Sequence, residues 1–285
     1  MAGELVIRAM IRAELDLLVD WAANEGWNPG ANDAQIFWDT DPEGFVAAEL
    51  QGELIGGGSI VSYGGRFGFM GFFIMRPEHR GLGLGTRLWF HRRDRLLSRL
   101  QSNAAIGMDG VFAMQPFYAR GGFVFSHRDL RFASVGAAAT LAKEIVDLSA
   151  VPFSEVLRYD AAHFPAPRER FLKAWITQQG SRALGALKHG VLRGYGVIRP
   201  CRNGFKIGPL FARDGETAEA LFRGLGDFAP DEALFLDVPE NNAEAMALAR
   251  RLGLREVFGC ARMYYRAPPP LSQAEIFGVT TFELG

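Results

Sequence analysis

The sequence has few of the features that mark secreted, metal-binding or membrane proteins. Cys201 and Cys260 are the only cysteines among 285 residues, and no C-x-x-C pair or Cys/His cluster accompanies them. We therefore interpret both as reduced, buried thiols and expect neither a disulfide nor a metal site. No apolar run approaches the roughly 18 residues that a membrane-spanning helix needs, so no membrane partner is expected.

A surplus of charge of one sign is also missing. Lys and Arg number 31 and Asp and Glu number 32, which gives a formal net charge of -1. Nucleic-acid-binding domains usually carry a basic surplus, so no nucleic-acid partner is expected. The N-terminus has an acid at Glu4 and no sustained apolar segment, which argues against a secretory signal and favours a cytoplasmic protein.

The composition that remains is that of a globular protein, with 48% hydrophobic and 22% charged residues. Apolar periodicity and turn residues predict the elements of the first half. These are a strand at 4–10, a helix around 15–22, a short helix opened by Asn32 or Asp33, strands at 44–50, 53–63 and 66–75, a helix at 83–100, a strand at 105–108, a helix at 113–120 and a strand from 123.

The second half repeats this order. We expect helices around 153–164 and 168–177, strands at 184–188, 192–199 and 205–211, a helix at 216–225, a strand at 234–238, a helix at 242–252 and a strand at 256–265. The Ala-rich stretch 133–150 has a weak apolar pattern, and we predict that it is the linker between two domains. Two copies of one α/β plan account for the order better than one large sheet, so we predict domains at 1–135 and 150–285.

The most informative segment is the glycine-rich turn Arg80-Gly81-Leu82-Gly83-Leu84-Gly85-Thr86, which follows an apolar strand and opens a helix. Glycines let the backbone approach a ligand closely, and free N–H groups at a helix start bind anions. The turn therefore suits a pyrophosphate, to which Arg80 adds positive charge. A Walker A loop would need Gly-Lys-Ser/Thr and a Rossmann turn would need glycine in place of Thr86, so neither pattern fits.

The pattern R-x-x-G-x-G, preceded by Met75-Arg76-Pro77-Glu78, resembles the coenzyme A pyrophosphate loop of the GNAT superfamily of N-acetyltransferases. The resemblance implies an α/β (α+β) fold of two GNAT-like domains, each a mixed, mostly antiparallel sheet flanked by helices. It also implies that acetyl-coenzyme A donates an acetyl group to an amine by direct attack in a ternary complex. The cofactor contacts that it implies are the backbone of Ile74 and Met75 and the residues Arg80, Gly81, Leu82, Gly83, Leu84, Gly85 and Thr86.

A second signature of that superfamily is a helix ending in Tyr-x-x-x-Gly-Phe, here Tyr118 to Phe123. The matching tyrosine lies near the coenzyme A sulfur in the superfamily, which implies that Tyr118 is the general acid for the leaving thiolate. The alternative is a tyrosine that only packs in the core. The superfamily often has Asn seven residues before this tyrosine, where this chain has Val111, a departure expected to loosen the local geometry.

The general base is harder to place. No Asp or Glu lies between Phe67 and Met75 on the fourth strand, so Asp109, at the end of the fifth strand, is the best candidate. Deprotonation through water is the alternative. Because both cysteines lie in the second half, a thiol acyl-enzyme in the first domain is excluded.

Four residues are expected to line the acceptor pocket. Trp27, Asn28 and Asp33 lie between the first two helices, where superfamily members line that pocket, and Tyr63 ends the third strand. Each also has a structural interpretation, as a rigid turn, a helix cap or an edge aromatic. The acceptor itself stays open between a small-molecule amine and a protein lysine, and the oligomeric state is not indicated.

The second half lacks both signatures. Ala249 stands at the tyrosine position, and the loop before the helix at 216–225 carries Asp214 and Glu216 in place of a glycine cluster. Carboxylates there would repel a pyrophosphate. The chain thus resembles tandem-GNAT proteins whose degenerate C-terminal domain supports the first, and we expect coenzyme A to bind only the N-terminal half. The alternative function is a non-catalytic coenzyme A-binding or interaction module.

Overall fold

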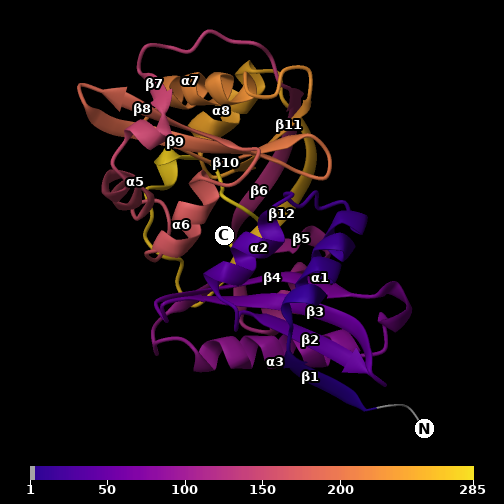
Figure 1. The fold of residues 1–285 in the computed structure, drawn as a ribbon. Helices are drawn as coiled ribbons and strands as arrows, with labels where there is room; N and C mark the ends of the chain where they lie inside the picture. Colours follow the sequence, from indigo (N-terminus) through magenta and orange to yellow (C-terminus); the bar gives the residue numbers. More distant parts are fainter. Residues whose placement is uncertain (1–3) are drawn as a thin grey trace.

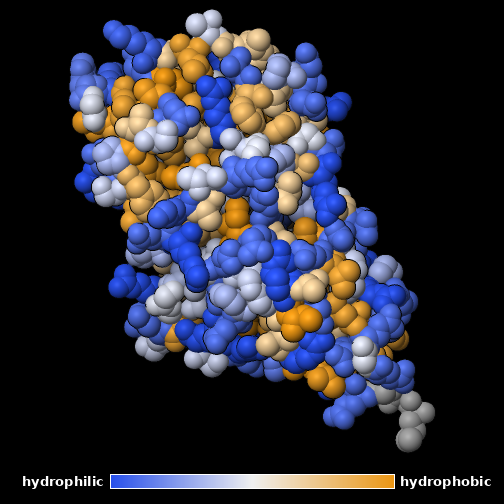
Figure 2. Space-filling model, in the orientation of Figure 1, coloured by the Kyte–Doolittle hydropathy of each residue, from blue (hydrophilic) through white to orange (hydrophobic). Residues whose placement is uncertain are grey.

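The computed structural model describes residues 4–285, and Met1 to Gly3, at the start of the segment inspected for a signal, lie outside the described residues. Two lobes are stacked on each other, and each is built mainly from one half of the sequence (Figure 1). On the face shown in Figure 2, hydrophilic and hydrophobic residues are interspersed over both lobes, which is the usual surface mix. No helix in the described part is long and apolar enough to cross a membrane.

The elements of the N-terminal half begin and end close to the positions expected from periodicity. They are β1 (Leu5–Ala9), α1 (Arg12–Asn24), α2 (Asp33–Thr40), β2 (Phe45–Leu50), β3 (Glu53–Tyr63), β4 (Phe67–Met75), α3 (Leu84–Ser98), β5 (Ala105–Val111), α4 (Gln115–Arg120) and β6 (Phe123–Val135). Helix α3 covers one face of this part of the sheet, and α1 and α2 cover the other (Figure 1). The apolar stripe of α1, which includes Leu15 and Leu18, is buried, and Gly26 ends the helix with a φ of +79°.

The C-terminal half repeats the plan. Its elements are β7 (Ile145–Asp147), α5 (Phe153–Asp160), α6 (Glu169–Ile176), β8 (Arg182–Lys188), β9 (Val191–Pro200), β10 (Phe205–Ala212), α7 (Gly215–Gly226), β11 (Ala233–Pro239), α8 (Ala243–Arg251), β12 (Arg255–Tyr265) and β13 (Ile276–Gly278). Strands β7 and β13 were not expected, because three residues are too few to show a period. The first lies in the predicted linker and the second in the tail that follows β12.

Strands β6 and β12, which complete the two copies of the plan, each lie in the sheet of the other half. The strand order is β1-β2-β3-β4-β5-β12-β6-β11-β10-β9-β8-β7. Strand β12 therefore occupies the place beside β5, and β6 occupies the place beside β11. The expected α+β fold and its two copies are confirmed, but one 13-stranded sheet joins them. The predicted boundary between 135 and 150 divides the sequence into its two copies. It does not divide the structure into its two lobes, because β6 and β12 each lie in the sheet of the other lobe.

The tail that follows β12 runs back through the C-terminal lobe towards the N-terminal one. Strand β13 pairs with β10, and the N–H of Val279 donates to the carbonyl of Asp237 on β11 at 2.9 Å. Because β10 and β11 pair directly only from Phe205 to Ile207, the tail fills the gap where these two strands diverge. Residues 276–285 are all buried, and they end between the two lobes (Figure 1).

Candidate functional site

A cavity of about 640 Å³ opens in the N-terminal lobe where β4 and β5 diverge. The two strands pair in parallel only over residues 67–69 and 105–107. Beyond this point a bulge bends β4, and Phe72 adopts a φ of +50°. Ile74 and Met75, two of the predicted cofactor contacts, line the cavity on the far side of the bulge. The opened edge of β4 leaves backbone groups available to a ligand oxygen.

The predicted phosphate loop lies at one end of this cavity. Gly81 and Gly83 have φ of +76° and +78°, and a Cβ atom on either would meet no atom within 4 Å. Glycine is therefore needed here for the conformation, and the backbone is open to a ligand. Helix α3 begins at Leu84, so the N–H groups of its first turn have no acceptor within the helix. The loop residues that line the cavity are Arg80, Gly81, Gly83, Gly85 and Thr86, whereas Leu82 is exposed.

Arg80 joins the loop to helix α1. Its Nε donates to the carbonyl of Met75 at 2.8 Å, and its Nη2 pairs with Glu25. The Arg80 and Glu25 side chains are 45% and 35% exposed. Solvent screens such a pair, so the guanidinium can turn to a bound phosphate at little cost.

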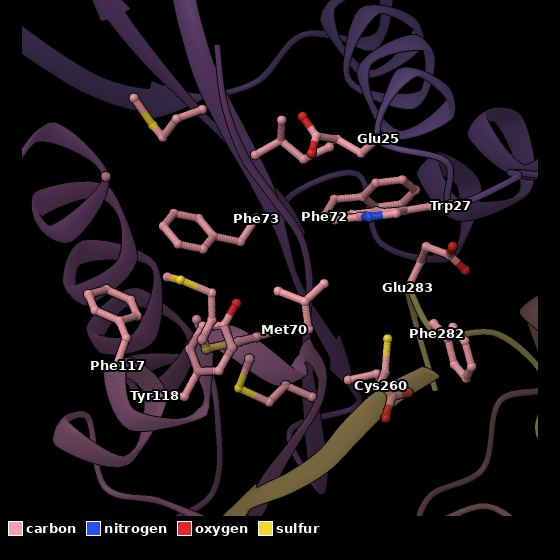
Figure 3. Close-up of a pocket in the computed structure, with 18 of the residues that line it drawn as sticks. Glu25, Trp27, Met70, Phe72, Phe73, Phe117, Tyr118, Cys260, Phe282 and Glu283 are labelled. Atoms are coloured by element: carbon pink, nitrogen blue, oxygen red, sulfur yellow. The ribbon is translucent and has the colours of Figure 1, made fainter. Parts of the chain in front are cut away.

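Tyr118 lies on the α4 side of the cavity, and its hydroxyl points inward (Figure 3). The ring packs against Trp89, with 6.0 Å between ring centroids. A Cβ atom on Gly110 would lie 2.3 Å from the Tyr118 ring, so glycine at 110 makes room for it. Burial raises the pKa of Tyr118 to about 12, and the Arg92 guanidinium opposes this. The hydroxyl therefore stays protonated at neutral pH, as a general acid must.

Asp109 also lines the cavity, but its carboxylate is already bonded. Both of its oxygens accept hydrogen bonds from Arg262 on the exchanged strand β12, each at 2.7 Å. Burial is the largest influence on the pKa of Asp109 and raises it, and Arg262 opposes that shift. Taking a proton from a substrate would disrupt this pair. The geometry therefore gives Asp109 the role of holding β12 against β5 in place of the predicted role of base.

Of the four residues expected at the acceptor pocket, only Trp27 lines the cavity. Asn28 instead faces the C-terminal lobe, where it exchanges hydrogen bonds with the backbone of Asn203 at 3.0 and 2.8 Å. Asp33 is fully buried and accepts from Arg199 at 3.0 and 3.2 Å. Neither side chain is placed to meet an acceptor.

Tyr63 also contacts the C-terminal half instead of the cavity. Its hydroxyl donates to the carbonyl of Leu284 in the C-terminal tail at 2.8 Å, and its ring meets that of Phe164 with 4.8 Å between centroids. The expectation for Asn28, Asp33 and Tyr63 assumed that this face of the first lobe was free. The second lobe covers it, so these polar groups hold the two lobes together.

Four residues that the sequence did not indicate complete the cavity wall. Phe258 and Cys260 come from β12, and Phe282 and Glu283 come from the tail. Figure 3 shows Cys260, Phe282 and Glu283 on the side of the cavity opposite Phe117 and Tyr118. No local motif marks these residues, because only the strand exchange and the folded tail bring them to the first lobe.

The position of Cys260 corrects the premise on which a thiol acyl-enzyme was excluded, namely that the first domain holds no cysteine. The thiol does line the cavity. Burial raises the pKa of Cys260 well above its usual range, and the charge of Asp109 adds to this effect. A thiol that stays protonated is a weak nucleophile.

The corresponding gap in the C-terminal lobe is closed in two ways. The tail runs between β10 and β11, as described above. At the start of α7, the carboxylate of Asp214 accepts a hydrogen bond from the N–H of Thr217 at 2.8 Å, and this bond lowers the pKa of Asp214. A donor that an anion would need is therefore taken by a side chain that would repel it.

Comparisons with known proteins identify relatives of both halves of the chain. The model of the acetyltransferase (GNAT) family matches residues 12–123, and that of an acetyltransferase (GNAT) domain matches residues 156–278. Holothin acyltransferase from Pseudoalteromonas sp. is 25% identical over 274 residues, which are 95% of this chain and 92% of that protein.

Solved structures share the whole architecture. A proposed acetyltransferase from Pyrococcus horikoshii has a TM-score of 0.84 at 21% identity, covering 99% of this chain and 96% of that one. A tandem GNAT protein from the clavulanic acid biosynthesis pathway has a TM-score of 0.60 at 14% identity, covering 93% and 99%. At these identities the likeness shows the fold of both halves together.

Proposed function

We propose that this chain, which belongs to the GNAT family of acyltransferases and contains two GNAT domains, transfers an acetyl group from acetyl-coenzyme A to a small-molecule amine in its N-terminal lobe. One observation carries the proposal. The glycine loop with its open backbone and the Tyr118 hydroxyl face the same cavity, at the place where β4 and β5 diverge.

The residues around the loop fit the donor. The unobstructed backbone of Gly81 and Gly83 and the free N–H groups at the start of α3 suit the pyrophosphate. The gap beside Ile74 and Met75 suits the narrower part of coenzyme A that runs from the pyrophosphate to the sulfur. When bound, acyl-coenzyme A supplies the acyl group as a thioester. Family membership supports an acyl-coenzyme A donor, and among acyl groups we propose acetyl.

The acceptor side of the cavity is largely apolar. Its wall includes Trp27, Phe72, Phe258 and Phe282, and the C-terminal lobe covers it. These features favour a small amine with an apolar or aromatic body over a lysine presented by a protein surface. The relative named for holothin acylation, similar along both halves, supports a small-molecule acceptor as well.

Tyr118 and Cys260, which both line the cavity, differ in their roles in proton transfer. The Tyr118 hydroxyl, protonated at neutral pH, donates to the departing sulfur. The protonated thiol of Cys260 takes no part, so the amine attacks directly while both substrates are bound.

Calorimetry with acetyl-coenzyme A, followed by a turnover assay on an amine panel, tests the proposal. We expect one binding site per chain and turnover that is fastest for arylalkylamines such as phenethylamine and tryptamine. Binding without turnover on any amine would instead favour the non-catalytic coenzyme A-binding module.

A further inference from the structure

The N-terminal lobe lacks a free base of its own on the strands that form the cavity. Strand β4 carries no acid, and Asp109 on β5 is bonded to Arg262 through both oxygens. We propose that the C-terminal tail supplies the general base, Glu283, which accepts the proton of the attacking amine directly or through one water. The proposal rests on the proposed function, and it makes the C-terminal half part of the active site.

The tail is seated on β4 at its bulge. A Cβ atom on Gly71 would lie 2.0 Å from the carbonyl oxygen of Glu283, so glycine at 71 is what admits the tail. The Ser59 hydroxyl accepts from the N–H of Gly71 at 2.9 Å and donates to the carbonyl of Glu283 at 3.4 Å. Glu283 thus lies beside the fourth-strand position at which an acid was expected and is missing.

The residues on either side of Glu283 are fixed as well. The Thr281 hydroxyl accepts from the N–H groups of Glu283 and Leu284 at 3.2 and 2.9 Å. The Leu284 carbonyl accepts from Tyr63, and Arg168 donates to the hydroxyl of Thr280 at 3.0 Å. A side chain on so constrained a turn is held in place before a substrate arrives.

The carboxylate of Glu283 is buried without a full set of partners. The residue is 3% exposed, and its Oε2 atom has no hydrogen-bond partner among residues 4–285. Figure 3 shows its side chain between Trp27 and Phe282 on the acceptor side of the cavity. A buried, unpaired carboxylate oxygen costs stability, so its presence beside a cavity calls for a functional explanation.

The surroundings make this carboxylate a stronger base than usual. Burial raises the pKa of Glu283. Lys206 on β10, Arg131 on β6 and Arg199 on β9 oppose that shift through their charge, and Asp33 on α2 reinforces it. The two arginines are already paired, Arg131 with Asp237 and Arg199 with Asp33. Neither arginine therefore forms an ion pair with Glu283, and the Glu283 carboxylate is left to accept a proton.

The step balances with the groups already described. The amine nitrogen bonds to the acyl carbon and the carbon–sulfur bond breaks. The nitrogen gives one proton to Glu283, and the sulfur gains one from Tyr118. Exchange with water then returns both side chains to their starting states, and the products are an amide and a free thiol.

The test compares the wild-type chain with Glu283→Gln, using acetyl-coenzyme A as donor and phenethylamine and tryptamine as acceptors. Loss of a general base typically lowers turnover by about 10²–10⁴-fold. We expect kcat/KM for the amine to fall within that range near pH 7, and the acidic limb of its pH profile to disappear. The coenzyme A affinity and the Tm should change little, which would show that the variant is folded and binds the donor.

Two further variants separate catalysis from structure. Glu275→Gln removes a carboxylate from the same tail, where it pairs with His163 and Arg213 away from the cavity, and should keep the wild-type profile. Glu283→Asp should restore part of the lost rate. A Glu283→Gln chain with wild-type kcat/KM and an unchanged acidic limb would overturn the base and leave the proposed function standing. A wild-type chain that binds acetyl-coenzyme A and acetylates no amine would overturn both.

Discussion

Arg262 on the exchanged strand β12 donates to both carboxylate oxygens of Asp109 on β5, each at 2.7 Å. This pair joins the two halves of the chain at the edge of the cavity. Asp129 on β6 lies within 3.4 Å of the same guanidinium, so one cation on β12 serves carboxylates from two strands, β5 and β6. The site and the contact between the lobes therefore cannot be altered independently here.

The first prediction follows from that pair. Asp109→Asn leaves Arg262 with one weak partner, and breaking a buried ion pair typically costs about 3–5 kcal/mol. We expect the free energy of unfolding to fall by an amount in that range in urea denaturation. Both lobes should still unfold in a single transition, because they share one sheet. Full stability with a large loss of turnover would instead restore Asp109 as the base.

Gly83→Glu tests the phosphate loop. Gly83 has a φ of +78°, and the new carboxylate would meet the pyrophosphate. Coenzyme A affinity should fall by at least the roughly 1–3 kcal/mol typical of an uncompensated buried polar group, which calorimetry would measure. Gly190 offers a matched control, because it also has a positive φ, +75°, and open space around it, in the hairpin between β8 and β9. Gly190→Glu should bind coenzyme A normally, and equal effects of the two variants would argue against the loop.

The stoichiometry of coenzyme A should be one per chain. The second lobe has its own tail in the gap between β10 and β11, and Asp214 caps the start of α7. Calorimetry on the full chain should fit one class of site, and Gly83→Glu should weaken it. A second site that survives this substitution would show that the C-terminal lobe also binds the cofactor.

Cys260→Ala tests direct transfer. Because the buried thiol has a raised pKa, we expect no acyl-enzyme. Turnover should stay within a few fold of the wild type, and initial-rate kinetics should show intersecting rather than parallel lines. Mass spectrometry after incubation with acetyl-coenzyme A alone would detect a gain of one acetyl group if this expectation is wrong.

Which parts of the site were predictable depends on how far apart their residues lie in the chain. The glycine loop and Tyr118 belong to contiguous motifs whose geometry is set by neighbours, so sequence alone identified them as candidates. Phe258 and Glu283 could not be found that way, because they reach the cavity only after β12 changes lobes and the tail crosses the molecule. Asp33 and Tyr63 were misinterpreted for the same reason, since their partners are Arg199 and Leu284.

The fold shows the same division. Strand and helix bounds followed from periodicity within each segment, and the two copies followed from their order. The exchange of β6 and β12 leaves no such trace, because either strand could complete either sheet with the same alternation of side chains.

The last prediction is that Tyr118→Phe removes the general acid. The phenyl ring keeps its packing against Trp89, so the fold and the coenzyme A affinity should be preserved. Turnover should drop by about 10²–10⁴-fold, the usual contribution of a general acid. The pKa of about 12 for Tyr118 adds a second criterion. The wild-type pH profile should show no basic limb from this hydroxyl below about pH 11, because a proton donor fails only once it has ionised.

Tyr159→Phe is the matched control for this substitution. Its hydroxyl donates to the carbonyl of Arg193 in the C-terminal lobe at 2.9 Å, away from the cavity, so losing it should affect stability only. A weakly nucleophilic amine would also be acetylated slowly, so the comparison must use the best amine found. If Tyr118→Phe and Tyr159→Phe then turn over at similar rates near that of the wild type, the thiolate takes its proton from water. Tyr118 would be left with a packing role.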